Sequence, residues 1–475
     1  MAAQTQGGVL APPPGRPPGA VPGRGPGRGP GRGPGRSSGS LAGSLSGSLA
    51  RLRLAARTPP GRLRTAGAVL VALALLFGVT AAWQSADRAA AARQLASRSE
   101  PLSQDAAELY RSLADADATA AAGFLMAAAE PPEVRKRYQD DLATASRLIP
   151  QAAARSGTSS DAQRRLAELS RQLPRYAGLV ETARAINREG LPLGGAYLRY
   201  ASDYLQKTVL PNAQQLADTE AAALDGDYDA ATAVPWAALV LGVLLLGALG
   251  RYQVVLFRRT NRVFNPGLLT ASAAVLVALV WTVGGTVAAG TGLHEARTQG
   301  IDPLRRLNQV RVVALQAHTA ENLNLVSRGA TEAYDDRWAE LARTLAGPAD
   351  SAGSAVGLLV APPDRARRQL TDAQHRFDEW QQRHAAAAEL DASGDYEGTL
   401  RTTLAPGRDD TAEAAFNAAE QQWEQAGRAE QATFDSAAGG VDGGLAVQAV
   451  AAALLAALAA GGTVRGLGRR LAEYR

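Results

Sequence analysis

The sequence contains no cysteine, which excludes disulfide bonds, thiol catalysis and every zinc or iron–sulfur site with cysteine ligands. It contains four histidines, and no two of them stand at the spacing of metal ligands. Phe, Trp and Tyr make up 5% of the chain, a small share for a globular enzyme. The nucleotide-binding, hydrolase, zinc-protease and kinase motifs are missing as well. We therefore predict a protein that is not an enzyme and binds no metal or cofactor.

Four stretches lack any charged residue, and each is long enough to cross the hydrocarbon of a bilayer as a helix. They are 65–86, 230–250, 263–293 and 443–464. The first three are rich in Val and Leu. The fourth is mostly alanine, so its insertion energy is marginal, and the segments that flank it support its assignment as a membrane helix. The sequence predicts an all-α integral membrane protein with four transmembrane helices, at 65–86, 230–250, 267–290 and 443–464. A cleaved signal peptide is the alternative for the first of them.

Positive charge is concentrated in three segments beside these helices. Residues 1–64 hold ten Arg and no acid, 251–262 hold four Arg and no acid, and 465–475 hold four Arg and one Glu. The rest of the chain is acidic. Because Lys and Arg near membrane helices stay on the cytoplasmic side, we expect both termini and the loop 251–266 to be cytoplasmic. The large regions 87–229 and 291–442 then lie outside the cell membrane.

The N-terminal tail, 1–64, is rich in Arg, Gly and Pro, and residues 22–36 repeat PGRG. This composition cannot bury a core, so the tail is predicted to be disordered. The period of four excludes collagen, which needs glycine at every third position. A solvated tail near lipid headgroups is the simplest interpretation, with a docking arm as an alternative. Nucleic-acid binding is not expected, because the tail lacks aromatic residues between its arginines.

Both outer regions read as antiparallel four-helix bundles. In the first, the membrane helix continues to about Ala128, a second helix covers 133–154, and Ser160 caps a third. A fourth helix carries three tyrosines and is interrupted at Pro211. The apolar seam of the third helix steps by three and four residues: Leu166, Leu169, Leu173, Tyr176, Val180 and Ala183. In the second region we expect helices at 304–328, 332–345, 363–390 and 410–436, and a glycine hinge at 439–444.

Polar residues share a helical stripe with core leucines between Leu304 and Arg328. Buried polar groups cost free energy unless they are paired. Glu321 is therefore expected either to pair with Arg328 or His318, or to join a ligand or partner contact, for which arginine suits a carboxylate. The candidates are Arg311, His318, Glu321, Asn324 and Arg328.

Tyrosines at helical spacing mark a second place, together with two acids of the first outer helix. They are Tyr197, Tyr200, Tyr204, Asp115 and Asp117. Tyrosines in such a row are usually part of a bundle core or its edge, and a partner contact is the alternative. On the cytoplasmic side, the candidates for an electrostatic partner contact are Arg251, Arg258, Arg259, Arg262, Arg465, Arg469 and Arg470.

Two segments carry a resemblance to a known family. They are LADADATAAAGFL with EPPEVRKRYQDDL, within 113–142, and ALQAHTAENLNLVSRG at 314–329. Together with the four-span layout, these segments make the chain resemble the GlnX-type membrane proteins of actinobacteria. The resemblance covers roughly residues 65–470. The resemblance implies a link between an extracellular amino-acid-binding lipoprotein and a cytoplasmic G-type Ser/Thr protein kinase. It implies no catalytic residue.

We therefore predict a non-enzymatic transmembrane signalling relay that reports extracellular nutrient status. Its expected partners are membrane lipid, a solute-binding lipoprotein and a Ser/Thr kinase or similar protein. A direct small-molecule receptor and a membrane scaffold are the alternatives. The ligand, the oligomeric state and the direction of the signal stay open.

Overall fold

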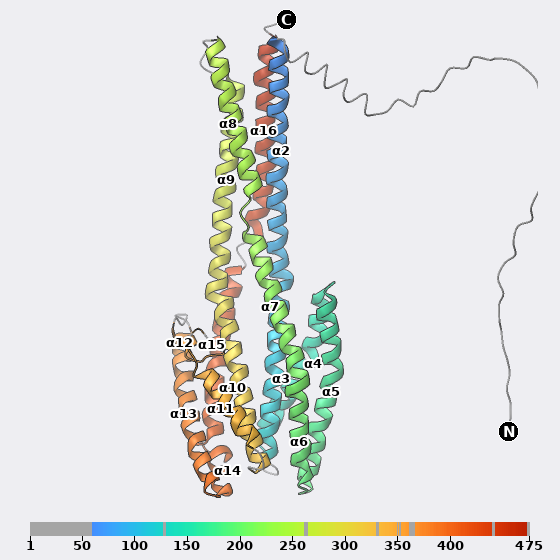
Figure 1. The fold of residues 1–475 in the computed structure, drawn as a ribbon, viewed down its shortest axis with the longest axis vertical. Helices are drawn as coiled ribbons and strands as arrows, with labels where there is room; N and C mark the ends of the chain where they lie inside the picture. Colours follow the sequence, from blue (N-terminus) through green and yellow to red (C-terminus); the bar gives the residue numbers. More distant parts are fainter. Residues whose placement is uncertain are drawn as a thin grey trace, which may run out of the picture. The chain divides into compact units, whose positions relative to one another are not determined.

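The computed structural model describes residues 59–126, 130–260, 265–328, 332–348, 350, 353–360, 366–438 and 442–472 (Figure 1). The predicted disorder of the tail up to residue 58, the predicted contact Arg262 and the hinge glycines 439–440 lie outside these residues. The chain divides into two units, Met1–Arg62 and Leu63–Arg475.

Two long helices connect the membrane part to the outer part, and the described residues contain helices and no strand. The first runs through α2 (Pro59–Gln94), the π-helical turn η1 (Leu95–Ser99) and α3 (Glu100–Met126). The second runs through α9 (Pro266–Ala296), the π-helical turn η4 (Arg297–Ile301) and α10 (Asp302–Ser327). The prediction of an all-α fold is confirmed, and the first membrane helix continues beyond the predicted span as expected. We keep the name outer regions for 87–229 and 291–442, after the predicted topology.

Each π-helical turn is followed by a proline two residues after its end. Pro101 follows η1, Pro303 follows η4, and Pro211 follows η3 (Leu205–Val209). Proline has no N–H and its ring collides with the carbonyl four residues earlier. Widening the preceding turn relieves this collision, and the residue just before each proline donates to the carbonyl five residues back. Pro211 therefore widens its helix and does not interrupt it as predicted.

The first outer region is completed by α4 (Pro132–Ser156), α5 (Ser160–Arg188), α6 (Leu193–Tyr204), η3 and α7 (Leu210–Thr232). The predicted apolar seam of α5, from Leu166 to Ala183, is buried. The N-cap is Ser159, one residue earlier than predicted, because its hydroxyl accepts from the backbone N–H of Ala162.

The second outer region contains α11 (Ala333–Leu345), α12 (Gly357–Val360), α13 (Arg367–Ala392), α14 (Tyr396–Leu404) and α15 (Ala412–Ala438). Three of the helices fall where the sequence predicts them. The short helices α12 and α14 do not appear among the predicted elements. They are four and nine residues long, which is too short for a clear helical period in the sequence.

The two outer regions share one core. Helices α3 and α10 pack against each other, and one cluster of buried apolar residues draws members from both regions. Leu109 and Tyr176 belong to it from the first region, and Trp380 and Trp423 from the second. The boundary between the regions is therefore a packed interface, and the faces of α3 and α10 that meet there are shielded from solvent.

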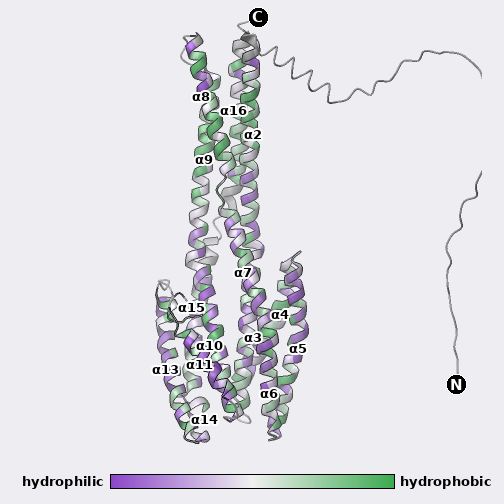
Figure 2. Cartoon of the chain, in the orientation of Figure 1, coloured by the Kyte–Doolittle hydropathy of each residue, from purple (hydrophilic) through white to green (hydrophobic). Residues whose placement is uncertain are grey.

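Within the residues that the structure describes, four helices are long and apolar enough to span a membrane, in or near the four predicted segments. They are α2, α8 (Trp236–Thr260), α9 and α16 (Asp442–Ala472). Figure 2 shows apolar residues concentrated in this part of the chain, and large apolar side chains such as Val243, Val280 and Leu454 are exposed there. The chain is a multi-pass membrane protein. We call the end where α2 and α9 begin and α8 and α16 finish the basic end.

The alanine-rich helix α16 lies closely along α9. A Cβ atom on Gly267 would meet the backbone of Gly466 at 2.4 Å, and one on Gly462 would meet the carbonyl of Gly267 at 2.9 Å. Asn265 also donates to the carbonyl of Gly466 at 2.9 Å. Small residues let membrane helices approach in this way and gain packing energy that lipid contact cannot supply. The composition that makes α16 weakly apolar thus suits it to pack on α9.

Candidate functional site

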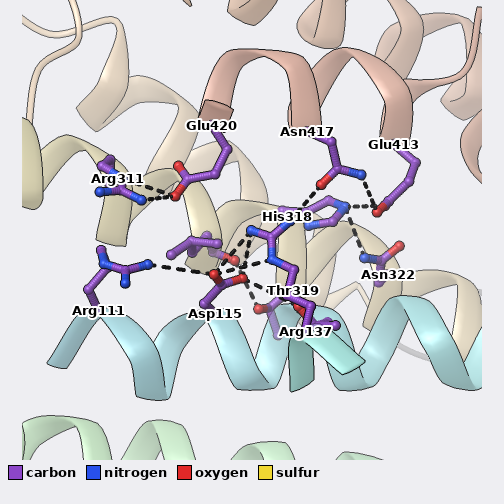
Figure 3. Close-up of polar contacts among 12 residues, drawn as sticks. Arg111, Asp115, Arg137, Arg311, His318, Thr319, Asn322, Glu413, Asn417 and Glu420 are labelled. Atoms are coloured by element: carbon purple, nitrogen blue, oxygen red, sulfur yellow. Dashed lines mark hydrogen bonds and ion pairs between the residues drawn. The ribbon is translucent and has the colours of Figure 1, made fainter. Parts of the chain in front are cut away.

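A network of buried and half-buried polar residues crosses the interface between the two outer regions. Figure 3 shows side chains from α3, α4, α10 and α15 converging there. We call it the inter-region network, and it consists of Arg111, Asp115, Arg137, Arg311, His318, Asn322, Glu413, Asn417 and Glu420. Two of these residues on α10 and one on α3 are among the predicted contacts.

Asp115 is the centre of the network on the first region's side. It is 4% exposed and forms an ion pair with Arg137 of α4 at 2.8 Å, and a longer one with Arg111 at 3.6 Å. Thr119 also donates to it at 3.3 Å. Arg137 in turn donates to the side-chain oxygen of Asn417 on α15 at 2.9 Å. One guanidinium group therefore connects both regions.

Arg311 and Glu420 form a buried ion pair within the second region. The Nε and Nη2 atoms of Arg311 lie 2.9 and 2.5 Å from Oε1 of Glu420. Both side chains are at most 8% exposed. Charged hydrogen bonds of this kind are stronger than neutral ones, and the pair fixes α10 against α15.

His318 is fully enclosed between α10 and α15. Its Nε2 atom lies 2.7 Å from Oε2 of Glu413, and its ring stacks on Phe416 with 4.0 Å between the ring centroids. Burial alone would lower the pKa of His318, but the charge and hydrogen bond of Glu413, with the charge of Glu321, outweigh it and raise the pKa. Burial would raise the pKa of Glu413, and His318 with Asn417 lowers it instead. Both directions favour a charged pair.

Glu321 belongs to a neighbouring aromatic cluster. Its Oε2 atom accepts from the indole N–H of Trp380 at 2.9 Å, and its Oε1 atom lies 2.7 Å from Nδ1 of His384. The predicted pairing of Glu321 with Arg328 or His318 is wrong. Helical spacing placed these residues on one stripe, but α13 supplies closer partners.

Arg328 and Asn324 lie at the end of α10, away from the network. Arg328 terminates the helix in the left-handed conformation with a φ of 53°, and its guanidinium lies 5.3 Å from the ring centroid of Tyr396. Asn324 donates to Asp335 at 2.6 Å. Both residues therefore hold α10 to its neighbours α11 and α14.

Asp117 is buried but belongs to a separate site inside the first region. Ser202 donates to it at 2.7 Å, and Gln206 and Tyr176 each donate at 3.2 Å. Burial raises the pKa of Asp117 to about 6, because these neutral donors compensate only part of the lost hydration. It lies two residues from Asp115 and so faces another side of α3.

The three predicted tyrosines lie along the α5–α6 edge of the first region. Tyr200 is 52% exposed and accepts from Arg175 at 3.2 Å, and Tyr204 lies beneath the same guanidinium at 4.6 Å. Tyr197 packs, half-buried, against the shared core. The structure does not bring them to the inter-region network.

At the basic end, the predicted partner contacts Arg251, Arg258 and Arg465 are exposed on α8 and α16. The side chains of Arg259, Arg469 and Arg470 lie outside the described residues, as does the whole of Arg262.

Sequence analysis did not identify several members of the site. They are Arg111, Arg137, Asn322, Glu413, Asn417, Glu420, Trp380 and His384. A signal was present for three of them: Glu413, Asn417 and Glu420 are spaced by four and three residues, on the same face of α15 as the buried Phe416. The sequence named two of their partners, Arg311 and His318, but not which residues pair, because the paired residues come from segments far apart in the chain.

A cavity of about 210 Å³ adjoins the network. It lies between α3, α4, α10 and α15, and its polar lining includes Asp115, Thr119, Arg137, His318, Glu413 and Asn417. Among the described residues, no cluster of three or more His, Asp and Glu side chains is arranged to hold a metal ion.

A second polar arrangement lies where the long helices leave the membrane part. Asp225 of α7 forms ion pairs with Arg297 of η4 at 3.3 Å and Arg305 of α10 at 3.0 Å. Asp227 accepts hydrogen bonds from Ser99 of η1 and Gln94 of α2. We call these contacts the collar. Through it, one stretch of α7 contacts the π-helical turns of both long helices.

Residues 91–229 match the family described as the actinobacterial sensor domain. A search of curated proteins and a search of solved structures each give no match. The matched segment includes α3 to α6 and α7 up to residue 229, and therefore Asp115, Arg137 and the α7 part of the collar. Together with the four membrane helices, the match supports a sensing role at a membrane.

Proposed function

We propose that the chain is a non-enzymatic transmembrane signalling relay that passes extracellular amino-acid status to a cytoplasmic partner. The input is a solute-binding lipoprotein that docks on the outer regions, and the output is a Ser/Thr kinase or similar protein. The sensor-domain match supports the sensing part of this proposal, and the family resemblance of the sequence suggests the two partners.

The observation that carries the proposal is the continuity of the helices. Asp115 lies on α3, which continues α2, and His318 and Arg311 lie on α10, which continues α9. Their partner helix α15 precedes the membrane helix α16 along the chain. A small shift of α3 against α10 in the outer part would therefore act directly on the membrane helices. Displacements of this size between packed helices are an established way to transmit a signal.

The collar supports the same route. It bonds α7 to the π-helical turns, which are the widened points of the two long helices. π-helical turns often occur at functional sites. A shift of α3 or α10 in the outer regions would therefore strain or break these contacts as it is transmitted to the membrane helices.

We place the basic end in the cytoplasm because of the positive-inside rule. The exposed Arg251, Arg258 and Arg465 then face a cytoplasmic partner. An acidic surface on this partner would be attracted and oriented by such a cluster.

The absence of cysteine allows a direct test by spin labelling. One cysteine would replace Val254 on α8 and another Val464 on α16, both exposed near the basic end. The full chain in lipid nanodiscs would be measured by double electron–electron resonance, with the purified amino-acid-binding lipoprotein of the same organism in its free and glutamate-loaded forms. We expect only the loaded form to change the distance, by about 1–2 Å or more.

A label pair within one helix, Val240 and Val254 of α8, is the matched control and should not change. If neither form of the lipoprotein alters the first pair, the relay is wrong. An equal change with both forms would point to the scaffold alternative, since a scaffold binds its partners regardless of nutrient.

The cytoplasmic contact has its own test, the replacement of Arg258, Arg259 and Arg262 by Gln. We expect loss of kinase binding by the nanodisc-embedded chain. Because these arginines also set topology, protease accessibility must first show that the orientation is unchanged. Full kinase binding by a correctly oriented variant would contradict this contact.

A further inference from the structure

We propose that the cavity between α3, α4, α10 and α15 is a binding site for a free α-amino acid. The inference goes beyond the relay and does not depend on it, since a relay driven only by a lipoprotein needs no such site.

The size and place of the cavity are the first argument. At about 210 Å³ it is smaller than the ~300–1,000 Å³ typical of sites for drug-sized ligands. It therefore suits a small metabolite. Because its walls come from both outer regions, a bound molecule would contact both and stabilise one arrangement of α3 against α10.

The charges of the lining are the second argument. Three carboxylates line the cavity, those of Asp115, Glu133 and Glu413, and the cations are Arg137 and His318. With all five charged, one negative charge is left over. This excess attracts an ammonium group into the cavity and repels a ligand that carries only negative charge.

The partly exposed guanidinium of Arg137 is the third argument. Arg137 lines the cavity, and its side chain is 34% exposed. Three of the five N–H donors of this guanidinium bond to Asp115 and Asn417. Two donors are left for a ligand carboxylate, and charged hydrogen bonds of this kind are stronger than neutral ones.

An α-amino acid meets these requirements together, because it carries an ammonium and a carboxylate group on one carbon. Its side chain would meet Val134, the half-buried apolar residue of the lining.

Isothermal titration calorimetry on the full chain in nanodiscs tests the proposal. The probes are L-alanine, L-glutamate and L-lysine, with ethylamine and acetate as compounds that carry one of the two charges. We expect at least one amino acid to bind, and both single-charge compounds to bind at least tenfold more weakly. If no amino acid binds, or if ethylamine or acetate binds as tightly, the proposal is wrong.

Two charge variants locate the site. Arg137→Gln and Glu413→Gln should each weaken binding about tenfold or more, the loss expected for one charged hydrogen bond. Lys136→Gln is the matched control, because Lys136 neighbours Arg137 on α4 and its side chain is 73% exposed. Its affinity should stay within about twofold of the unaltered chain. Equal affinities for Arg137→Gln and Lys136→Gln would overturn the assignment.

A cavity-filling variant tests the same site without changing a charge, in case the charge variants fail to fold. Val134 is half-buried and lines the cavity. Val134→Phe enlarges an apolar side chain at the wall of the cavity and leaves the charges intact, so the melting temperature without ligand should not fall by more than a few degrees. We expect this variant to lose binding. If it is folded and binds as before, the amino acid occupies another place.

Failure here and failure of the relay can be told apart. A chain that binds no amino acid but changes its α8–α16 distance with the loaded lipoprotein keeps the relay and loses this site.

Discussion

The two outer regions begin alike, and the partners of their buried acids depend on where each acid lies. Each region starts with a membrane helix, a π-helical turn, a proline and a helix with buried polar residues. Asp117, inside the first region, is held by neutral donors. The acids of the inter-region network have cationic partners in both regions, Arg137 for Asp115, His318 for Glu413 and Arg311 for Glu420.

The consequence is visible in the protonation of the acids. Among neutral donors, burial raises the pKa of Asp117 to about 6. Burial also acts to raise the pKa of Glu413, whose side chain is 14% exposed, but His318 and Asn417 outweigh it and the pKa is lowered. Depth of burial therefore does not decide the charge of a carboxylate by itself, and the nearest partner determines the sign of the shift.

The largest expected effect comes from breaking the ion pair of the second region. Arg311→Met leaves Glu420 buried without its cation, which typically costs about 3–5 kcal/mol. The double variant Arg311→Met, Glu420→Met should regain most of this loss, because two apolar side chains need no partner. Thermal unfolding of the full chain in detergent measures both.

The control is Arg164→Met on α5, in the first region, whose ion pair with Asp161 is exposed. It should change the stability far less than Arg311→Met. If the double variant is as unstable as the single one, the pair is not the source of the effect.

The next effect concerns His318 and Glu413. The raised pKa of His318 means that its contribution is complete below its ordinary value of 6.5 and is lost as pH rises through the folded pKa. The lowered pKa of Glu413 means that its contribution is complete above 4.5 and is lost as pH falls through the folded pKa. The pair therefore stabilises most between about pH 4.5 and 6.5.

Glu413→Gln should remove the pH dependence of Glu413 and weaken or reverse that of His318, whose pKa burial lowers when Glu413 is neutralised. It should cost about 2 kcal/mol within that window, the loss of one charged hydrogen bond. Unfolding curves between pH 4 and 9 provide the measurement. His375→Gln on α13 is the control, because His375 is exposed and only loosely paired with Glu379 at 3.6 Å. An unaltered pH profile for Glu413→Gln would show that the pair is not charged.

The stability due to Asp117 should change with pH in the opposite direction to that of Glu413. Its pKa is raised from 3.8 to about 6, so the folded state binds its proton more tightly and loses stability as pH rises between these values. Between pH 5 and 7 this loss amounts to about 1 kcal/mol. Asp117→Asn should abolish it, which unfolding at the two pH values would show. An equal loss in the variant would assign it to other groups.

The smallest effect is expected at the collar, where the groups are partly exposed. Asp225→Asn removes the ion pairs with Arg297 and Arg305 and should cost at most about 1 kcal/mol. Asp227→Asn removes the corresponding contact with Ser99 of the first long helix.

Hydrogen exchange separates the two collar variants. Asp225→Asn should speed exchange in η4 and leave η1 unchanged, and Asp227→Asn should do the reverse. Equal acceleration of both turns by either variant would mean that the collar opens as one unit.

Much of the architecture could be predicted because it depends on local and periodic signals. Charge-free runs located the membrane helices, and steps of three and four residues located the seam of α5 and the polar stripe of α10. The effect of the prolines was harder to predict. Pro211 was expected to interrupt a helix that in the structure continues through a π-helical turn.

The site was predicted only in part, since the α10 stripe named Arg311, His318 and Glu321 but not their partners. Their partners Glu420, Glu413 and Trp380 lie 59 to 109 residues away along the chain. Helical period shows which side chains share a face, and it contains no information about which helix will cover that face.

By itself, the sequence determined the helical class, the membrane helices, the basic segments and the helix that carries buried polar groups. Each of these depends on the free energy of placing a segment in lipid, water or a helical stripe. Only the tertiary structure decided that α3 packs on α10, that Asp115 and Asp117 belong to different sites, and that a charged cavity lies between the two regions. The physical reason is that these features depend on how long helices pack, and many packings satisfy the same apolar period.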